Sequence, residues 1–116
     1  MSTWDTYIFS EDANVDFLDE LAGLEPDETA EAVRDACLLA VDAAASEDEI
    51  LNGQAAATIA AIWAGAPFSA GEIASSYSFL RGTSVELDEK LISAAVSILE
   101  SIDAEQDVDQ FLEALS

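Results

Sequence analysis

The sequence predicts an all-α protein, in which a compact bundle of five or six helices surrounds a neutral, alanine-rich central helix. Apolar residues recur at helical spacing along nearly the whole chain, and no convincing strand pattern appears. Residues typical of helix caps and helix ends interrupt this pattern at short intervals. The stretch 50–71 contains no charged residue, although the segments on both sides are acidic. A buried helix with charged helices around it would produce that distribution.

The chain of 116 residues is expected to fold as one domain, residues 1–116, because no linker or internal repeat divides it. Residues 1–9 are expected to form an irregular N-terminal arm. The aromatic side chains of this arm are expected to pack over the bundle and tie the N-terminus to it. The alternative is that they form an exposed aromatic patch for a partner. These aromatic residues are Trp4, Tyr7 and Phe9.

The first helix is predicted over residues 11–22. Ser10 is a favourable N-cap before it, and Gly23 is a favourable residue to end it. The side chains expected to face inward are Val15, Phe17, Leu18 and Leu21.

The second helix is predicted to begin at Pro26 and to run to about residue 45. Most of its inner stripe consists of small residues, so a neighbouring helix could approach closely there. Cys37 belongs to this stripe and is the only cysteine of the chain, so we interpret it as a small core residue without a disulfide partner. The stripe is Val33, Cys37, Ala40, Val41 and Ala44, with Leu38 on its flank.

The third helix is the central one. Ser46 and Glu49 have the spacing of a capping box, which predicts the start of this uncharged helix. The uncharged stretch 50–71 is long enough to cross a bilayer. Its polar residues, its alanines and Pro67 favour a buried core helix over a membrane span. The residues expected to face the core are Leu51, Ala55, Ile59, Ile62 and Trp63.

Three further helices complete the predicted bundle. Residues 69–82 begin with a second capping pattern and hold a shorter helix. Ser84 caps a long helix over about residues 85–102, and a last helix covers about residues 108–115. The aromatic residues interpreted as core are Trp63, Phe79 and Phe111.

The charge balance is extreme. The chain has 25 acids, three bases and no histidine, which gives a net charge of −22. This charge argues against nucleic acid and anionic membranes as direct partners, because phosphate binding needs clustered lysine and arginine. A basic protein is the kind of partner that it favours. The N-terminus has neither a basic region nor an apolar run, so we expect no signal peptide and a cytoplasmic protein. The three bases are Arg34, Arg81 and Lys90.

Motifs for catalysis or for a cofactor are absent from the sequence. Without histidine the usual general base is missing, and one cysteine cannot supply a structural zinc site. No nucleophile elbow, phosphate loop or dinucleotide fingerprint appears. We therefore expect neither an enzyme nor a bound cofactor. A carboxylate-based metal site or enzyme is the minor alternative.

Two acidic runs begin like the calcium loop of an EF-hand. The first is Asp12, Asn14 and Asp16. An EF-hand then requires glycine at the sixth position and glutamate at the twelfth, where this chain has Phe17 and Gly23. The second run, residues 103–109, fails at the same two positions. Neither run therefore predicts an EF-hand.

The placement of the acids leads to the functional hypotheses. Many acids lie in predicted first turns, where each complements the helix dipole by roughly 0.3–1 kcal/mol. The pairs Asp12 with Asp16 and Asp16 with Glu20 instead bring like charges together four residues apart, which destabilises a helix. Our leading hypothesis is a noncatalytic interaction module that binds a basic protein, as an immunity-type inhibitor or a mimic of nucleic acid would. The alternative is an adaptation to high salt, or a means of solubility, without a partner for the acidic face.

The neutral helix itself carries a few polar residues. Asn52, Gln54 and Thr58 are the candidates for a polar site on it. Cap or core hydrogen bonds are the alternative role for these side chains.

The N-terminal segment resembles a known family. The run Trp4-Asp5-Thr6-Tyr7-Ile8-Phe9-Ser10-Glu11-Asp12, followed by Asp16-Phe17-Leu18, is similar to the pattern W-G-x-G-x-F-x-N-D-x-A-x-D-F-L-x-x-L of the small bacterial domain of unknown function 4259. The alanine-rich helix of that family resembles residues 55–61. No activity comes with the resemblance, which implies motif positions without an assigned role. These positions are Trp4, Phe9, Asp12 and Asp16.

The sequence departs from this family pattern at four positions. Asp5 and Tyr7 replace two glycines, and Glu11 replaces an asparagine. Thr58 stands where the family has a glutamate. For Asp12 we expect a structural role, in which its carboxylate bonds backbone amides of its own first turn or fixes the arm.

Overall fold

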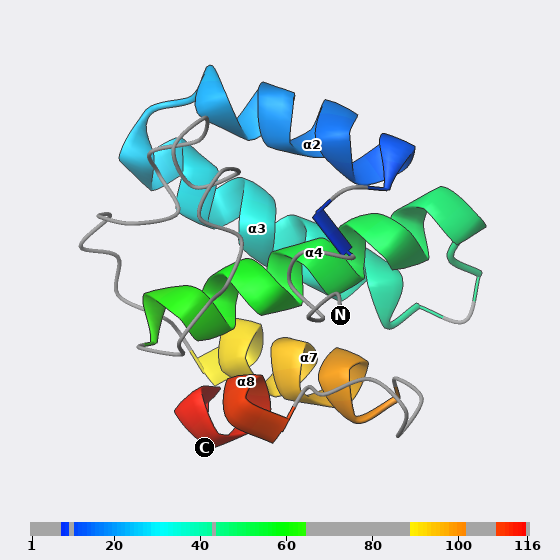
Figure 1. Ribbon diagram of the computed structural model, residues 1–116, viewed down its shortest axis with the longest axis vertical. Coiled ribbons are helices and arrows are strands. Elements are labelled where there is room, and N and C mark those ends of the chain that lie inside the picture. Colours follow the sequence, from blue (N-terminus) through cyan, green and yellow to red (C-terminus); the bar gives the residue numbers. More distant parts are fainter. Residues whose placement is uncertain (1–7, 10, 43, 65–88, 102–108, 116) are drawn as a thin grey trace, which may run out of the picture.

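The computed structural model describes residues 8–9, 11–42, 44–64, 89–101 and 109–115, and the regular structure in these ranges is entirely helical (Figure 1). The all-α prediction is therefore confirmed. The helices are α2 (Asp12–Ala22), α3 (Pro26–Ala40), α4 (Glu47–Trp63), α7 (Glu89–Glu100) and α8 (Asp109–Leu115).

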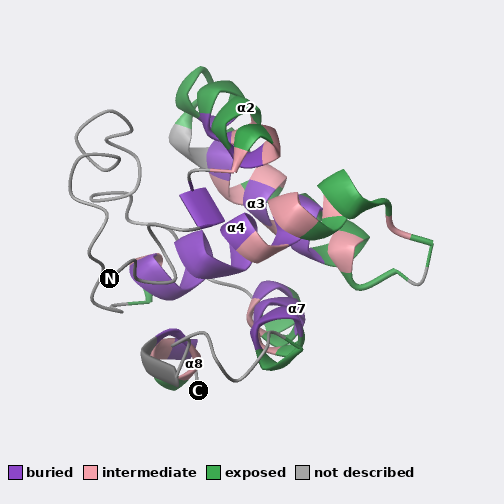
Figure 2. Cartoon of the chain, turned by 45° about the vertical axis from the view of Figure 1, so that its right-hand side comes forward, coloured by how far each residue is buried: buried purple, intermediate pink, exposed green. Residues whose placement is uncertain are grey.

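Helix α4 forms the centre of the bundle. It contacts α2, α3, α7 and α8, and Figure 1 shows α2 and α3 on one side of it and α7 and α8 on the other. Residues 55–62 are all buried, as Figure 2 shows in purple. A helix that is apolar on every side must be covered on every side, and this one is. The prediction of an alanine-rich central helix is confirmed, and its residues 50–63 are uncharged, although its first turn also includes Glu47, Asp48 and Glu49.

The start of α4 follows the predicted capping box. The Ser46 hydroxyl accepts a hydrogen bond from the Glu49 amide at 3.2 Å, and the Glu49 carboxylate accepts one from the Ser46 amide at 2.9 Å. Together these bonds satisfy two of the backbone donors that a helix start leaves free. Glu47, Asp48 and Glu49 also place negative charge in the first turn, where the helix dipole favours it.

Helix α3 packs against the first half of α4 at very short range. Gly53 of α4 faces Ala40 of α3, and an added Cβ on Gly53 would collide with the Ala40 Cβ. The same Cβ would lie 3.2 Å from the carbonyl oxygen of Ala36. The close approach predicted from the small residues of α3 is therefore confirmed.

Helix α3 is shorter than predicted. It ends at Ala40 rather than near residue 45, and both Val41 and Ala44 are exposed instead of lying on an inner stripe. The physical reason lies in Asp42, whose carboxylate accepts a hydrogen bond from the Ala44 amide at 2.9 Å. Such a local side-chain bond offers the backbone an alternative to the next helical turn. Val33 and Cys37 are buried as predicted.

The buried face of helix α2 differs from the predicted one. Leu18 and Leu21 are buried as expected, but Val15 is 38% exposed and Asn14 is fully buried in its place. The N-cap residue is Glu11, without a side-chain capping bond, and not Ser10. Gly23 does end the helix, but with a right-handed φ of −87°.

The end of the predicted arm belongs to the core. Ile8 and Phe9 are helical and almost completely buried, so the arm is not irregular throughout. The expectation that Phe9 packs onto the bundle is confirmed, and an exposed patch that includes Phe9 is excluded. Trp4 and Tyr7 lie outside the described residues.

Helices α7 and α8 close the core from the other side of α4. Among the aromatic residues predicted to lie in the core, Phe111 is buried and Trp63 is partly buried. Phe79 lies outside the described residues, and so do the two helix starts predicted at Ser69 and Ser84. None of the described helices has both the length and the hydropathy needed to cross a membrane. The buried residues of α7 are Leu91, Ala94, Ala95, Ile98 and Leu99.

Candidate interaction surface

Three acids line one side of α2. Asp12, Asp16 and Glu20 are spaced four residues apart, and all three are exposed. We call this set the acidic ridge. The last turn of α2 contains no basic residue that would offset the charge. The helix therefore presents a row of like charges to solvent, which lowers its own stability.

Asn14 anchors the segment before α2. Its side-chain amide is fully buried and donates a hydrogen bond to the Ile8 carbonyl at 2.7 Å. The spacing of Asp12, Asn14 and Asp16 indicates a calcium-like run and does not predict this role. Asn14, Leu18 and Leu21 have the spacing of one helical face, and that spacing was the available signal.

The acidic run 12–16 is a helix and not a metal loop. The amide of Asn14 points into the core, which removes it as a cation ligand. Across the described ranges, no group of three histidine, cysteine, aspartate or glutamate side chains could hold a metal ion. Most of the second acidic run, namely residues 103–108, lies outside those ranges.

The candidate polar residues of α4 do not share one open face. Thr58 is fully buried, and its hydroxyl donates to the Gln54 carbonyl one turn earlier at 2.8 Å. Asn52 and Gln54 are both half-buried, but they are two positions apart and so project from different sides of the helix. The Asn52 Oδ1 is shielded from solvent and has no hydrogen-bond partner. Thr58 therefore makes the kind of core hydrogen bond that was the alternative role, whereas the Asn52 oxygen does not.

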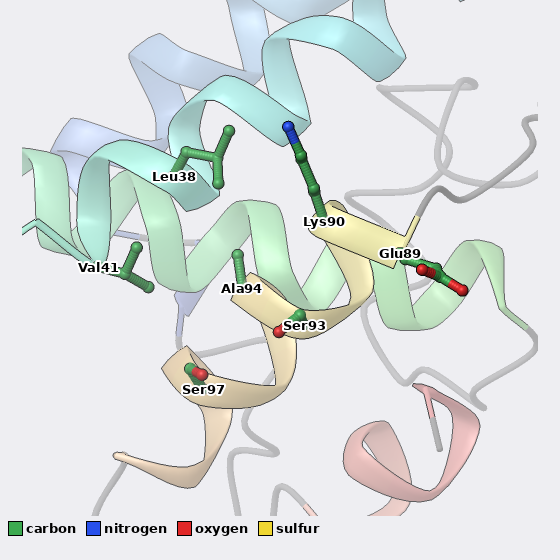
Figure 3. Close-up of a pocket in the computed structure, with 7 residues that line it drawn as sticks. All are labelled: Leu38, Val41, Glu89, Lys90, Ser93, Ala94 and Ser97. Atoms are coloured by element: carbon green, nitrogen blue, oxygen red, sulfur yellow. The ribbon is translucent and has the colours of Figure 1, made fainter.

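A groove runs between the end of α3 and the start of α7 (Figure 3). It has a volume of about 380 Å³ and is open to solvent. Leu38 of α3 and Val41, the residue that follows α3, line one side of it. In Figure 3 Lys90 extends from α7 toward α3, while Glu89 points away. The residues that α7 contributes are Glu89, Lys90, Ser93, Ala94 and Ser97.

The α3 side of the groove is unusually apolar for an exposed surface. Leu38 is 40% exposed and Val41 is 48% exposed, and their neighbour Leu39 is 51% exposed. The helical spacing of Val41, which continues the buried stripe of α3, predicts a core position. The end of α3 at Ala40 instead places it at the surface.

The chain was compared with known families, curated proteins and solved structures. A family model described as a domain of unknown function (DUF4259) matches residues 2–114. This chain belongs to the DUF4259 family. No curated protein and no solved structure matches it.

The DUF4259 motif residues divide between core and surface. Phe9 is 1% exposed and packs in the core, whereas Asp12 and Asp16 are exposed on α2. Trp4 lies outside the described residues. Phe9 therefore serves the fold, and the two aspartates belong to the acidic ridge.

Cys37 is a core residue of this DUF4259 protein, as predicted. Its side chain is fully buried, and that burial raises the pKa of the thiol to about 12. A thiol with such a pKa stays protonated at neutral pH, and only the thiolate is a strong nucleophile. Cys37 is therefore suited to packing and not to nucleophilic chemistry.

Proposed function

We propose that this protein is a noncatalytic interaction module that binds a basic protein through its acidic surface. The observation that carries the proposal is the acidic ridge of Asp12, Asp16 and Glu20. The acids of the α4 first turn stabilise their own helix, but Asp16 repels a like charge on either side of it. Because the acidic ridge lowers the stability of the folded protein, we infer that it is of use in binding.

Association with a basic protein supplies such a benefit. A net charge of −22 creates a strong negative field, which attracts a positively charged partner and speeds the encounter. The same field repels nucleic acid and anionic membranes. The partner class that fits is therefore a basic protein, bound by an immunity-type inhibitor or by a mimic of nucleic acid. We place this interaction in the bacterial cytoplasm.

Retention of proteins from a cell lysate on the immobilised protein tests the proposal. We expect one or a few basic proteins to be retained at both about 50 mM and about 150 mM NaCl, where the Debye length is still about 8 Å or more. Beads that carry polyglutamate control for simple ion exchange. The proposal is wrong if no basic protein is retained beyond the level of these beads at either salt concentration.

Adaptation to high salt is the second candidate function of the acidity. The chain has one lysine in 116 residues. Such a low number favours this candidate, because an adaptation of the whole surface would replace lysines wherever they occur. The average charge of other proteins from the same cells tests this candidate. If they are equally acidic, the charge reflects the environment. If they are not, the acidity is particular to this protein.

A further inference from the structure

We propose that the groove between α3 and α7 binds a small monocarboxylate with an aliphatic chain. Its carboxylate lies at Lys90, and its chain lies along Leu38 and Val41. This goes beyond the proposed function, because it concerns a small ligand and not a protein partner. It also uses a different part of the molecule, since the acidic ridge lies on α2.

The groove contains a cation that can meet a ligand. Lys90 extends from α7 toward α3, whereas Glu89, the acid among the described lining residues, points away (Figure 3). No described acid forms an ion pair with Lys90, whereas the Arg34 Nε lies 3.9 Å from the Asp35 Oδ1. The charge of Lys90 is therefore available to an anion inside the groove.

The rest of the α7 wall is polar without being acidic. Ser93 and Ser97 follow Lys90 at helical spacing, so the three side chains share one face of α7. Both serines are exposed, and a hydroxyl group can donate a hydrogen bond to a carboxylate or to its water shell. The α7 wall thus offers one positive charge and two hydroxyl groups to an anionic head group.

The opposite wall suits an aliphatic chain. Leu38 and Val41 lie about one turn apart at the end of α3, and Ala94 of α7 faces them across the groove. Because Leu38 and Val41 are both exposed, an aliphatic chain laid against them would remove apolar surface from water on both sides of the contact. A ligand with an aliphatic chain and a carboxylate therefore matches both walls.

The size of the groove indicates a small occupant. Its volume of about 380 Å³ lies near the lower end of the range of about 300–1,000 Å³ for small-molecule pockets. From Lys90 to Ser97 the axis of α7 advances by about 10 Å. Since a carbon–carbon single bond is about 1.5 Å long, an extended chain of about eight carbons has a similar length.

The net charge of the protein limits the ligand to one negative charge. A charge of −22 repels an acidic protein, a second copy of the chain or a dianion more strongly than it repels a single carboxylate. At about 150 mM salt, a Debye length of about 8 Å screens the more distant acids, whereas Lys90 acts at contact distance. One lysine in the groove therefore complements one carboxylate.

A titration with three ligands of equal chain length tests the proposal. The probes are octanoate, octan-1-ol and octylammonium, whose head groups are negative, neutral and positive. Two-dimensional NMR spectra of the backbone amides, recorded at about 150 mM NaCl, report both the affinity and the site. We expect octanoate to shift the amides of residues 38–41 and 90–97. We also expect it to bind about threefold more tightly than octan-1-ol, with octylammonium weakest.

Matched variants separate the charge from the apolar wall. Lys90→Met removes the charge and keeps an apolar stem, so we expect it to abolish the preference for octanoate over octan-1-ol. Ala22→Glu makes the net charge more negative by the same one unit at an exposed residue outside the groove, and the preference should remain. Leu38→Ala should weaken both ligands about threefold and leave their ratio unchanged.

Three results would each overturn the proposal. Tightest binding of octylammonium would show that the net charge governs the groove. An unchanged preference in Lys90→Met, or equal binding of octanoate and octan-1-ol to the wild type, would remove the role of Lys90. Amide shifts that avoid the groove with every ligand would remove the site. None of these results bears on the proposed function, which the retention of basic proteins tests separately.

Discussion

Gly53 of α4 packs directly against Ala40 of α3, and there is no room between the two for one more methyl group. This contact places the first half of α4 against α3 and fixes the end of α3 over α4. Leu38 and Val41 at that end form one wall of the groove. The close approach of two small residues thus sets the position of this wall.

Replacing Gly53 with alanine tests this contact. Alanine is normally favoured over glycine inside a helix by about 1 kcal/mol, but overpacking of a core costs about 1–3 kcal/mol. We expect Gly53→Ala to lower the free energy of unfolding, measured in urea, by up to about 2 kcal/mol. Gly23→Ala is the control, because its new Cβ would meet only the Glu20 carbonyl at 3.6 Å. Equal stability of the two variants would contradict the account of the contact.

Replacing Asn14 tests the anchor between α2 and the segment before it. Asn14→Ala removes the hydrogen bond to Ile8 and leaves a buried carbonyl without its donor, at a cost of about 1–3 kcal/mol in the free energy of unfolding. Asn14→Asp keeps the shape but loses the donor and buries a charge. We expect it to be the less stable of the two at neutral pH in chemical unfolding. A stable Asn14→Asp variant would show that the residue is not buried as described.

The thiol of Cys37 gives a prediction for the dependence of stability on pH. Burial raises its pKa from 9.0 in the unfolded chain to about 12 in the folded protein. The folded state therefore holds its proton more tightly. This contribution is fully present below pH 9 and is lost at up to about 1.4 kcal/mol per pH unit as the pH rises toward 12.

Two measurements check this prediction. A thiol reagent at about pH 8 should react with Cys37 only as fast as the protein opens, since the folded thiol is neutral and enclosed. The free energy of unfolding should fall less steeply above pH 9 in Cys37→Ala than in the wild type. Rapid labelling of the folded wild type would contradict the burial of the thiol.

Replacing Asp16 tests the cost of the acidic ridge. Asp16→Asn removes the repulsion with both Asp12 and Glu20, so we expect a gain of about 0.4–1 kcal/mol in the free energy of unfolding at low salt. The gain should shrink at high salt because of screening. Asp35→Asn serves as the comparison. Asp35 has only one like charge four residues away, Glu31, and its replacement also removes the ion pair with Arg34 at 3.9 Å, so its gain should be smaller. An equal gain in both variants would point to net charge rather than to the ridge.

Local patterns in the sequence were sufficient to predict part of the fold. The capping box of Ser46 and Glu49 depends on residues three positions apart, and the burial of Ala55 and Ile59 follows from a helix without charge. The acidic ridge likewise follows from a spacing of four residues.

Other features depend on contacts that no local pattern contains. Hydrophobicity alone predicts Val15 buried and Asn14 exposed, and the reverse is found, because Asn14 bonds the Ile8 carbonyl six residues earlier in the chain. The groove requires Leu38 and Ser93, more than 50 positions apart in the sequence, to lie on neighbouring helices. Sequence spacing does not show which helices are neighbours.

The central claim is that the acidic surface serves binding at the expense of stability. One comparison of the double variant Asp16→Asn/Glu20→Gln with the wild type tests it, by measuring the free energy of unfolding and the retention of basic lysate proteins side by side. The account predicts opposite directions: the variant is more stable, because the ridge repulsion is relieved, and it retains less basic protein, because the attracting field is weaker. A variant that is more stable and retains basic proteins as well as the wild type does would contradict the claim.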